Sequence, residues 1–278
     1  MNRVLGFGPT ITSSARIWDA LRGGKDNYPV DREIAEKMLC VAPDTGLLVS
    51  YVQQFHHQAT RSAARARIKQ FIDLGTGMPT GPADSVGAIA REVIASSARV
   101  VYIDNDPLVQ AHADALLANA PGLTVLNADI RQPDEIVGLL KQGLIDFTKP
   151  VALSAICVLD HVLDHEGPAA ILAAFGEVMA PGSRLVLTHS CDESTVDLMH
   201  TYNAATVDTP AEIVFRSAAE IASLADGFDL TEPGLKPVQQ LISDRLPRTR
   251  MVILGAEYTL TDPAPATNSA HHQERAHT

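Results

Sequence analysis

Residues 71–82 read FIDLGTGMPTGP, and this stretch carries the strongest structural signal in the chain. Its apolar start is typical of a buried strand, and the segment DLGTG at 73–77 is typical of a turn that leads from a strand into a helix. Glycines in such a turn let the backbone approach a ligand closely and present N–H groups near a helix start. The stretch therefore predicts a ligand site at the end of a strand.

Strand-like and helix-like runs alternate from this stretch towards the C-terminus. Strands are expected at 70–74, 99–103, 123–128, 150–156 and 183–188, with helices at 83–95, 107–118, from 133, and at 168–179. This alternation is typical of a parallel sheet with crossover helices. Helical stretches from 193 and at 217–224 precede two late strands, 228–230 and 251–259, which indicate a hairpin-like end to the sheet.

The segment before the sheet has a helical pattern. One helix is expected to begin at Ser13 or Ser14 and to stop at Gly23, a second to cover 31–39, and a third 45–68. The tail beyond residue 261 is polar and has no apolar run, so it is predicted to be disordered. We therefore expect a helical cap at 1–68, a sheet domain at 69–261 and a tail at 262–278.

The chain has 278 residues, and 22 Lys and Arg against 33 Asp and Glu give a net charge of −11. This balance argues against binding nucleic acid or anionic lipid over a broad surface, because both need a positive field. The first residues do not form a signal peptide, and no run approaches the roughly 20 apolar residues of a membrane span, so we expect a cytoplasmic protein. The three Cys form no CxxC pair, so no zinc site or disulfide framework is indicated and no metal ligand is assigned.

The glycine pattern distinguishes between two kinds of cofactor. A dinucleotide fingerprint, G-x-G-x-x-G, needs a third glycine where the chain has Thr80, and Gly81 is one residue out of register. An NAD-linked oxidoreductase is therefore disfavoured. Asp73 stands two residues before the first glycine, where a carboxylate repels a pyrophosphate and suits a cationic amino-acid end.

Two further carboxylates follow the next two strands. Asp104 can accept both hydroxyls of a ribose, and Asp129 can accept a bond from an adenine amino group beside the apolar Ile130. Asp106 is more simply explained as the cap of the helix that Pro107 opens. Because the carboxyl ends of parallel strands meet at one edge of a sheet, three carboxylates there predict a site for S-adenosylmethionine (SAM).

Several segments of the chain resemble a bacterial family of SAM-dependent methyltransferases that was long catalogued as a domain of unknown function. The segments lie at 15–39, 70–80, 99–117, 126–136, 150–164, 172–190 and 216–238. GGKDNY at 23–28 and DNDP at 104–107 are more specific than the glycine loop alone. The family, from bacteria rich in secondary metabolism, implies an α/β, Rossmann-like class I methyltransferase fold. Its sheet has seven strands, the last antiparallel, and here it would carry an N-terminal helical cap.

The resemblance also implies which residues bind the cofactor. The carbonyl near Ile156 would approach the methionine amino group, and Tyr28 in the GGKDNY turn would be a lid contact. The methionine end is assigned to Asp73, Gly75 and Gly77, with Thr76 between them, the ribose to Asp104, and the adenine to Asn105, Asp129 and Ile130.

The family implies no established acceptor, and the expected reaction is methyl transfer to a small molecule, with natural products as one class. The chain departs from the family in its third helix, where YVQQFHHQATRSAAR replaces an Arg-x-Asn-Arg-like segment, and at Asp160-His161, where many members have two His. These departures leave a SAM-binding protein without methyl transfer as the alternative. No nucleic-acid or membrane partner is expected, and a homodimer is one of the oligomeric states left open.

Histidines that follow strands are the candidates for a general base. His161 follows the fourth strand and His189 the fifth, and a structural role as a packed histidine is equally open for His161. Adjacent residues on a helix point to different faces, so at most one of His56 and His57 is expected to face the cleft.

Three side chains near the N-terminus can be explained without a role in catalysis. Trp18 lies at helical spacing with Leu21 and is interpreted as core packing. Arg16 and Lys25 either neutralise the carboxylate of the cofactor or are solvated surface charges.

Overall fold

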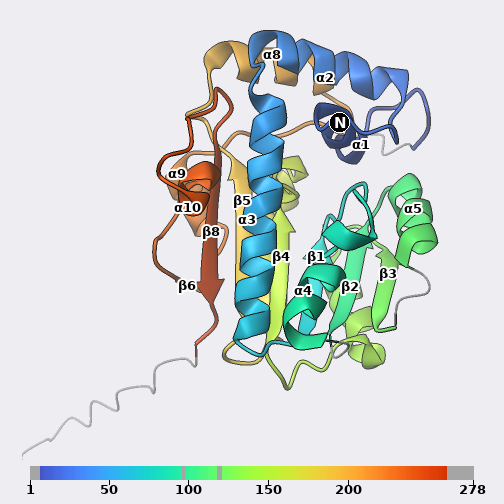
Figure 1. Ribbon diagram of the computed structural model, residues 1–278, viewed down its shortest axis with the longest axis vertical. Coiled ribbons are helices and arrows are strands. Elements are labelled where there is room, and N and C mark those ends of the chain that lie inside the picture. Colours follow the sequence, from blue (N-terminus) through green and yellow to red (C-terminus); the bar gives the residue numbers. More distant parts are fainter. Residues whose placement is uncertain (1–6, 96–97, 118–120, 262–278) are drawn as a thin grey trace, which may run out of the picture.

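The computed structural model describes residues 7–95, 98–117 and 121–261, which form a mixed sheet with helices on both faces (Figure 1). The expected tail at 262–278 lies outside the described residues. The strands are β1 (Gln70–Leu74), β2 (Arg99–Asp104), β3 (Leu123–Asn127), β4 (Val151–Ile156), β5 (Arg184–Ser190), β6 (Asp229–Leu230), β7 (Lys236–Pro237) and β8 (Ile253–Thr259). Their order is β3-β2-β1-β4-β5-β8-β6, in which β1 to β5 are parallel and β8 is antiparallel to β5.

The edge of the sheet beyond β8 is made of two short pieces. β6 pairs with Thr259 and Tyr258 of β8, whereas β7 pairs with Gly255 and Leu254 further along the same strand. The two pieces therefore share one position, and the eight strands of the described residues fill the seven positions that the class I fold requires. The expected Rossmann-like sheet with an antiparallel last strand is confirmed.

Alternate residues of the central strands enter two separate cores, because successive side chains of a strand point to opposite faces. Ile72 of β1 belongs to a core with residues of α6 (Pro133–Leu139) and α7 (Pro168–Gly176). Phe71 belongs to a core with residues of α3 (Thr45–Arg65) and α4 (Val86–Ile94). Figure 1 shows α3 running along the sheet, where it contacts β4, β5 and β8. The third helix of the expected cap thus also covers the sheet.

Two helices at the ligand edge begin at capping residues. The Asp106 carboxylate accepts a hydrogen bond from the Leu108 N–H (2.9 Å) at the start of α5 (Pro107–Leu117), as expected for a cap. Ser85 caps α4 through the Ala88 N–H (3.2 Å), after a separate helical turn at Pro82–Asp84. Two shorter helices, α9 (Ala218–Ser223) and α10 (Val238–Ile242), lie later in the chain, and short helical turns occur at Leu140–Leu144, Leu159–His161 and Asp164–Glu166. None of the helices in the described part of the chain combines the length and apolar character that crossing a bilayer requires.

The N-terminal helices α1 (Ser14–Leu21) and α2 (Pro29–Val41) pack with α8 (Val196–Thr206) at the top of Figure 1. Ile17 of α1 and Leu48 of α3 share an apolar core with Leu198 of α8 and Ile253 of β8. Side chains from both expected segments, 1–68 and 69–261, therefore form one common apolar core.

A buried ion cluster ties α1 to the sheet. The guanidinium of Arg16, which is 1% exposed, lies 2.8 Å from Asp31 and 3.0 Å from Asp106. The Ser13 hydroxyl donates to the same Asp106 carboxylate (2.7 Å). Arg16 is therefore neither solvated nor directed at a cofactor, in contrast to both alternatives drawn from the sequence.

Candidate active site

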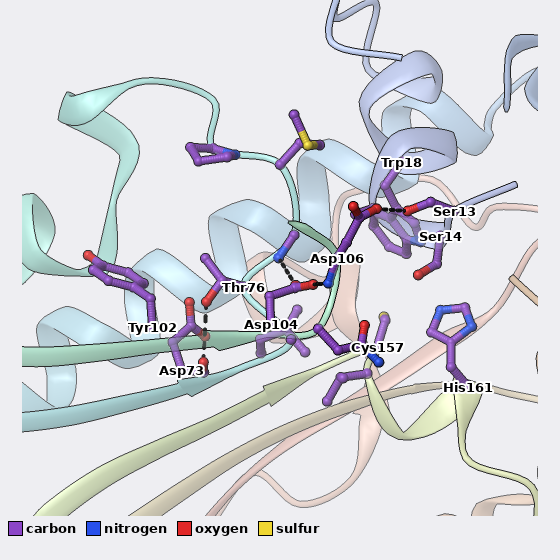
Figure 2. A pocket seen from close by; sticks show the side chains of 18 of the residues that line it. Ser13, Ser14, Trp18, Asp73, Thr76, Tyr102, Asp104, Asp106, Cys157 and His161 are labelled. Atoms are coloured by element: carbon purple, nitrogen blue, oxygen red, sulfur yellow. Dashed lines mark hydrogen bonds between the residues drawn. The ribbon is translucent and has the colours of Figure 1, made fainter. Parts of the chain in front are cut away.

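A cavity of about 260 Å³ opens at the carboxyl edge of β1, β2, β3 and β4 (Figure 2). The loops that follow these strands line it together with residues of α1 and α3. It contains the expected cofactor residues Asp73, Gly75, Thr76, Gly77, Asp104, Asn105, Asp129, Ile130 and Ile156, and the candidate base His161. The fold thus gathers side chains from four strand ends at the edge where parallel sheets bind ligands.

Asp73 lines this cavity from β1. Its Oδ1 accepts a hydrogen bond from the Ser154 hydroxyl of β4 (2.6 Å), and its backbone carbonyl accepts one from the Thr76 hydroxyl (3.3 Å). Burial raises the pKa of Asp73 to about 6, against these hydrogen bonds. The carboxylate is ionised at neutral pH, and a cation that binds beside it would stabilise its charged form.

Asp104 is held by two backbone N–H groups. Its Oδ2 accepts from Gly77 (2.9 Å) and its Oδ1 accepts from Asp106 (2.9 Å). Burial raises the pKa of Asp104 to about 6, and the neighbouring carboxylates Asp106 and Asp73 act in the same direction. Each carboxylate oxygen keeps a lone pair for a further donor, so the side chain can accept two more hydrogen bonds.

Asp129 has a cationic neighbour that the sequence interpretation did not identify. Arg131 donates to its two oxygens from Nε (2.9 Å) and from Nη2 (2.5 Å), and Nη1 donates to Glu166 (2.9 Å). Burial raises the pKa of Asp129, but the hydrogen bonds from Arg131 outweigh it and hold the pKa below its ordinary value. Asp129 is therefore a fixed anion. In the sequence, the only indication of this ion pair is that Arg131 stands two positions after Asp129.

The glycine loop needs its first glycine for space. Gly75 has φ +65°, and a Cβ atom there would lie 2.2 Å from Cγ2 of Val158. Gly77 has φ +66° but has no atom in the way of a Cβ within 4 Å. The N–H of Gly75 donates to the Ile103 carbonyl (2.8 Å), which fixes the loop against β2.

His161 lines the cavity from the turn after β4. Its Nδ1 lies 3.0 Å from the backbone carbonyl of Glu212. A carbonyl can only accept, so Nδ1 carries the proton and Nε2 is the basic nitrogen of the neutral ring. Cys157 lines the same cavity, but burial raises the pKa of its thiol well above the ordinary value, so it is not a thiolate.

His189 lies outside the cavity, contrary to the expectation. β5 continues to Ser190, two residues beyond the expected end, so His189 is inside the sheet and 0% exposed. Its Nδ1 lies 2.9 Å from the Ser190 carbonyl and 3.3 Å from Asp160, and its Nε2 lies 2.7 Å from the guanidinium of Arg216. His189 therefore stabilises the interior beneath the turn that carries His161.

Tyr28 does not line the cavity either. It is the residue before α2, where its N–H donates to Asp31 (2.9 Å), and its ring lies 5.0 Å from the guanidinium carbon of Arg16. The structure therefore does not bring Tyr28 to the cavity, where the lid contact was expected, but places its ring against Arg16 of the ion cluster. Trp18, interpreted as core, lines the cavity as well as packing against the core of α1 and α3.

The adjacent histidines His56 and His57 both line the cavity, although at most one was expected to face it. Their positions on α3 are neighbours around the helix, and the cavity is wide enough to border both. His57 lies with Nε2 3.1 Å from the Asp84 carbonyl. His56 Nε2 lies 3.8 Å from Oδ1 of Asp73.

Comparison with known proteins agrees with this geometry. A family model described as S-adenosyl methyltransferase matches residues 9–258. The chain is similar to a provisionally named methyltransferase of Thermobifida fusca, with 29% identity and a TM-score of 0.81 over 91% of this chain and 96% of that one. It is similar to a DUF574 family protein of Streptomyces avermitilis, with 30% identity and a TM-score of 0.82 over 90% and 98% of the two chains. No curated protein has significant sequence similarity to the chain.

Proposed function

The chain belongs to the S-adenosyl methyltransferase family and is a SAM-dependent methyltransferase, and from this premise we propose that it methylates a small molecule held in the cavity at the carboxyl edge of the sheet. One observation carries the proposal: Asp73, Asp104 and Asp129 lie at the carboxyl ends of three successive strands and line one cavity. When bound, SAM supplies a methyl group on a positively charged sulfur, open to in-line attack by an acceptor atom. The residues of the chain bind the cofactor, orient the acceptor towards the methyl group and exclude water from the cavity.

The cavity residues fit this cofactor. Asp73 would hold the cationic methionine end beside Gly75, Thr76 and Gly77, with the carbonyl near Ile156 towards the amino group. The free lone pairs of Asp104 would accept the two ribose hydroxyls. Asn105, Asp129 and Ile130 would contact the adenine.

The acceptor side of the cavity contains a base and an apolar wall. Nε2 of His161 would accept the proton that a hydroxyl or protonated amine gives up, while the Glu212 carbonyl fixes its tautomer. Apolar side chains would exclude water from this region; they are Trp18, Val49, Val52, Val162 and Pro210. Because Trp18 and Val49 come from the N-terminal helices, we propose that residues 1–68 act as a cap over the substrate, and that 69–261 form the cofactor domain.

The test is transfer from methyl-labelled SAM to a panel of small phenols, alcohols and amines, followed by separation of the labelled products. We expect labelled product with at least one acceptor, and a decrease of about a hundredfold to ten-thousandfold in His161→Gln. His200→Gln, an exposed position on α8, is the matched control and should keep the wild-type rate. Tight SAM binding without transfer to any acceptor of the panel would contradict the proposal.

A further inference from the structure

Nε2 of His56 is a buried polar atom without a hydrogen-bond partner among the described residues. The side chain comes from α3, is 15% exposed, and lines the cavity. Oδ1 of Asp73 lies 3.8 Å away, beyond hydrogen-bond distance. A buried polar atom left without a partner is costly, so its position beside the cavity indicates that a ligand group completes it.

Three other nitrogen-bearing side chains of the cavity are paired with protein groups. His57 is paired with the Asp84 carbonyl, and the guanidinium of Arg22 donates to the Met78 carbonyl. Arg131 is held by Asp129 and Glu166. The charged and titratable residues that line the cavity are Arg22, His56, His57, Asp73, Asp84, Tyr102, Asp104, Asp106, Asp129, Arg131, Cys157 and His161. Among these, His56 offers a nitrogen beside Asp73.

The methionine end of the cofactor carries an ammonium and a carboxylate on the same carbon atom. A carboxylate and a nitrogen donor 3.8 Å apart can therefore contact one such group from two sides, with the ammonium on Asp73 and the carboxylate on His56. The pair is complementary to this zwitterion in both charge and hydrogen bonding. Asp73 alone would leave the carboxylate facing another carboxylate.

We propose that His56 is the residue that binds the α-carboxylate of SAM, through a hydrogen bond donated by Nε2–H. This assignment rests on the proposed placement of the methionine end at Asp73. Burial, with His57 as the second cause, lowers the pKa of His56 to about 3, so the ring is neutral near pH 7. A neutral imidazole carries one N–H, which the proposal places on Nε2, so no proton is taken up at this residue.

Two ligands separate this role from a structural one. S-adenosylhomocysteine carries the amino-acid end, whereas 5′-methylthioadenosine has the same adenosine and thioether without it. Calorimetry gives the Kd of each ligand for the wild type, His56→Leu, His56→Gln and the exposed control His200→Gln. His56→Gln keeps an N–H donor, whereas His56→Leu does not.

We expect His56→Leu to weaken S-adenosylhomocysteine by about tenfold to a hundredfold and to leave 5′-methylthioadenosine unchanged. His56→Gln should recover a large part of the loss, and His200→Gln should match the wild type. Equal weakening of both ligands in His56→Leu would overturn the proposal, because it would show a structural role. Unchanged affinity for S-adenosylhomocysteine would overturn the role of His56 alone, whereas a wild-type protein that binds neither ligand would overturn the proposed cofactor site as well.

Discussion

The carboxylate of Asp104, at the end of β2, accepts a hydrogen bond from the backbone N–H of Gly77 over 2.9 Å. Gly77 lies in the loop after β1, so this bond joins the carboxyl ends of two neighbouring strands. The second oxygen of Asp104 is held by the N–H of Asp106, also at 2.9 Å. The side chain is therefore oriented before a ligand arrives, and a preorganised acceptor reduces the cost of binding.

Substitution of Asp104 tests its role towards the ribose. Asp104→Asn replaces one acceptor oxygen by an N–H donor that faces a backbone N–H, so we expect the Kd for S-adenosylhomocysteine to rise about tenfold to a hundredfold. Calorimetry measures the change. Asp114→Asn, exposed on α5, is the control and should bind as the wild type does. An unchanged Kd in Asp104→Asn would exclude a direct contact with the cofactor.

The pKa values of Asp73 and Asp104 are both raised to about 6. As a result, the stability of the fold and the affinity for the cofactor should depend on pH in opposite directions. The folded state holds these protons more tightly than the unfolded state, whose pKa is 3.8. Their contribution to stability is therefore complete below 3.8 and is lost as the pH rises through about 6. Cofactor affinity should instead increase over the upper part of that window, because the ionised carboxylates bind the ammonium and the hydroxyls.

Thermal denaturation of the ligand-free protein and calorimetry with S-adenosylhomocysteine, both from pH 5 to 8, check these two signs. The side chain at position 104 cannot ionise in Asp104→Asn. The difference in pH dependence between this variant and the wild type therefore gives the contribution of Asp104. Cofactor affinity that falls as the pH rises from 5 to 7 would be inconsistent with ionised carboxylates as the binding groups.

The two loop glycines should respond differently to alanine. Gly75→Ala places a Cβ 2.2 Å from Val158 in addition to the strain of a positive φ, whereas Gly77→Ala adds only the strain. We expect Gly77→Ala to cost about 1 kcal/mol of unfolding free energy, and Gly75→Ala about 1–3 kcal/mol more. Urea denaturation measures both variants, and equal losses would show that Val158 can move aside.

The buried cluster around Arg16 should dominate the stability of the N-terminal helices. Arg16→Met leaves Asp31 and Asp106 as buried carboxylates without their cation, and we expect a loss of about 3–5 kcal/mol in unfolding free energy. Lys37→Met removes an exposed ion pair with Glu33 on α2 and should leave the unfolding free energy close to that of the wild type. Denaturation curves with similar midpoints for the two variants would contradict a structural role of the cluster.

Features that depend on local patterns could be predicted from the sequence. The strand at 70–74 is observed with the expected ends, because its apolar run and the glycines after it are local signals. The row of Asp73, Asp104 and Asp129 could be predicted because parallel strands place their carboxyl ends at one edge. Their location in one cavity agrees with that reasoning, and their contact with the cofactor stays a prediction.

Features that depend on distant contacts could not be predicted. Ser13 and Asp106 are 93 positions apart, and no pattern in either segment indicates that they meet. The position of His189 depends on the pairing of β5 with β8, which extends β5 by two residues and places the ring inside the sheet. Whether His56 faces the cavity depends on the rotation of α3, which the packing against the sheet fixes.

The central claim is that the carboxylates at the ends of β1, β2 and β3 hold one SAM molecule. A crystal structure of the complex with S-adenosylhomocysteine tests it most directly. We predict both ribose hydroxyls within hydrogen-bond distance of Asp104, the amino group beside Asp73, and the adenine against Ile130 and Asp129. A nucleoside bound elsewhere, or a ribose without contact to Asp104, would contradict it.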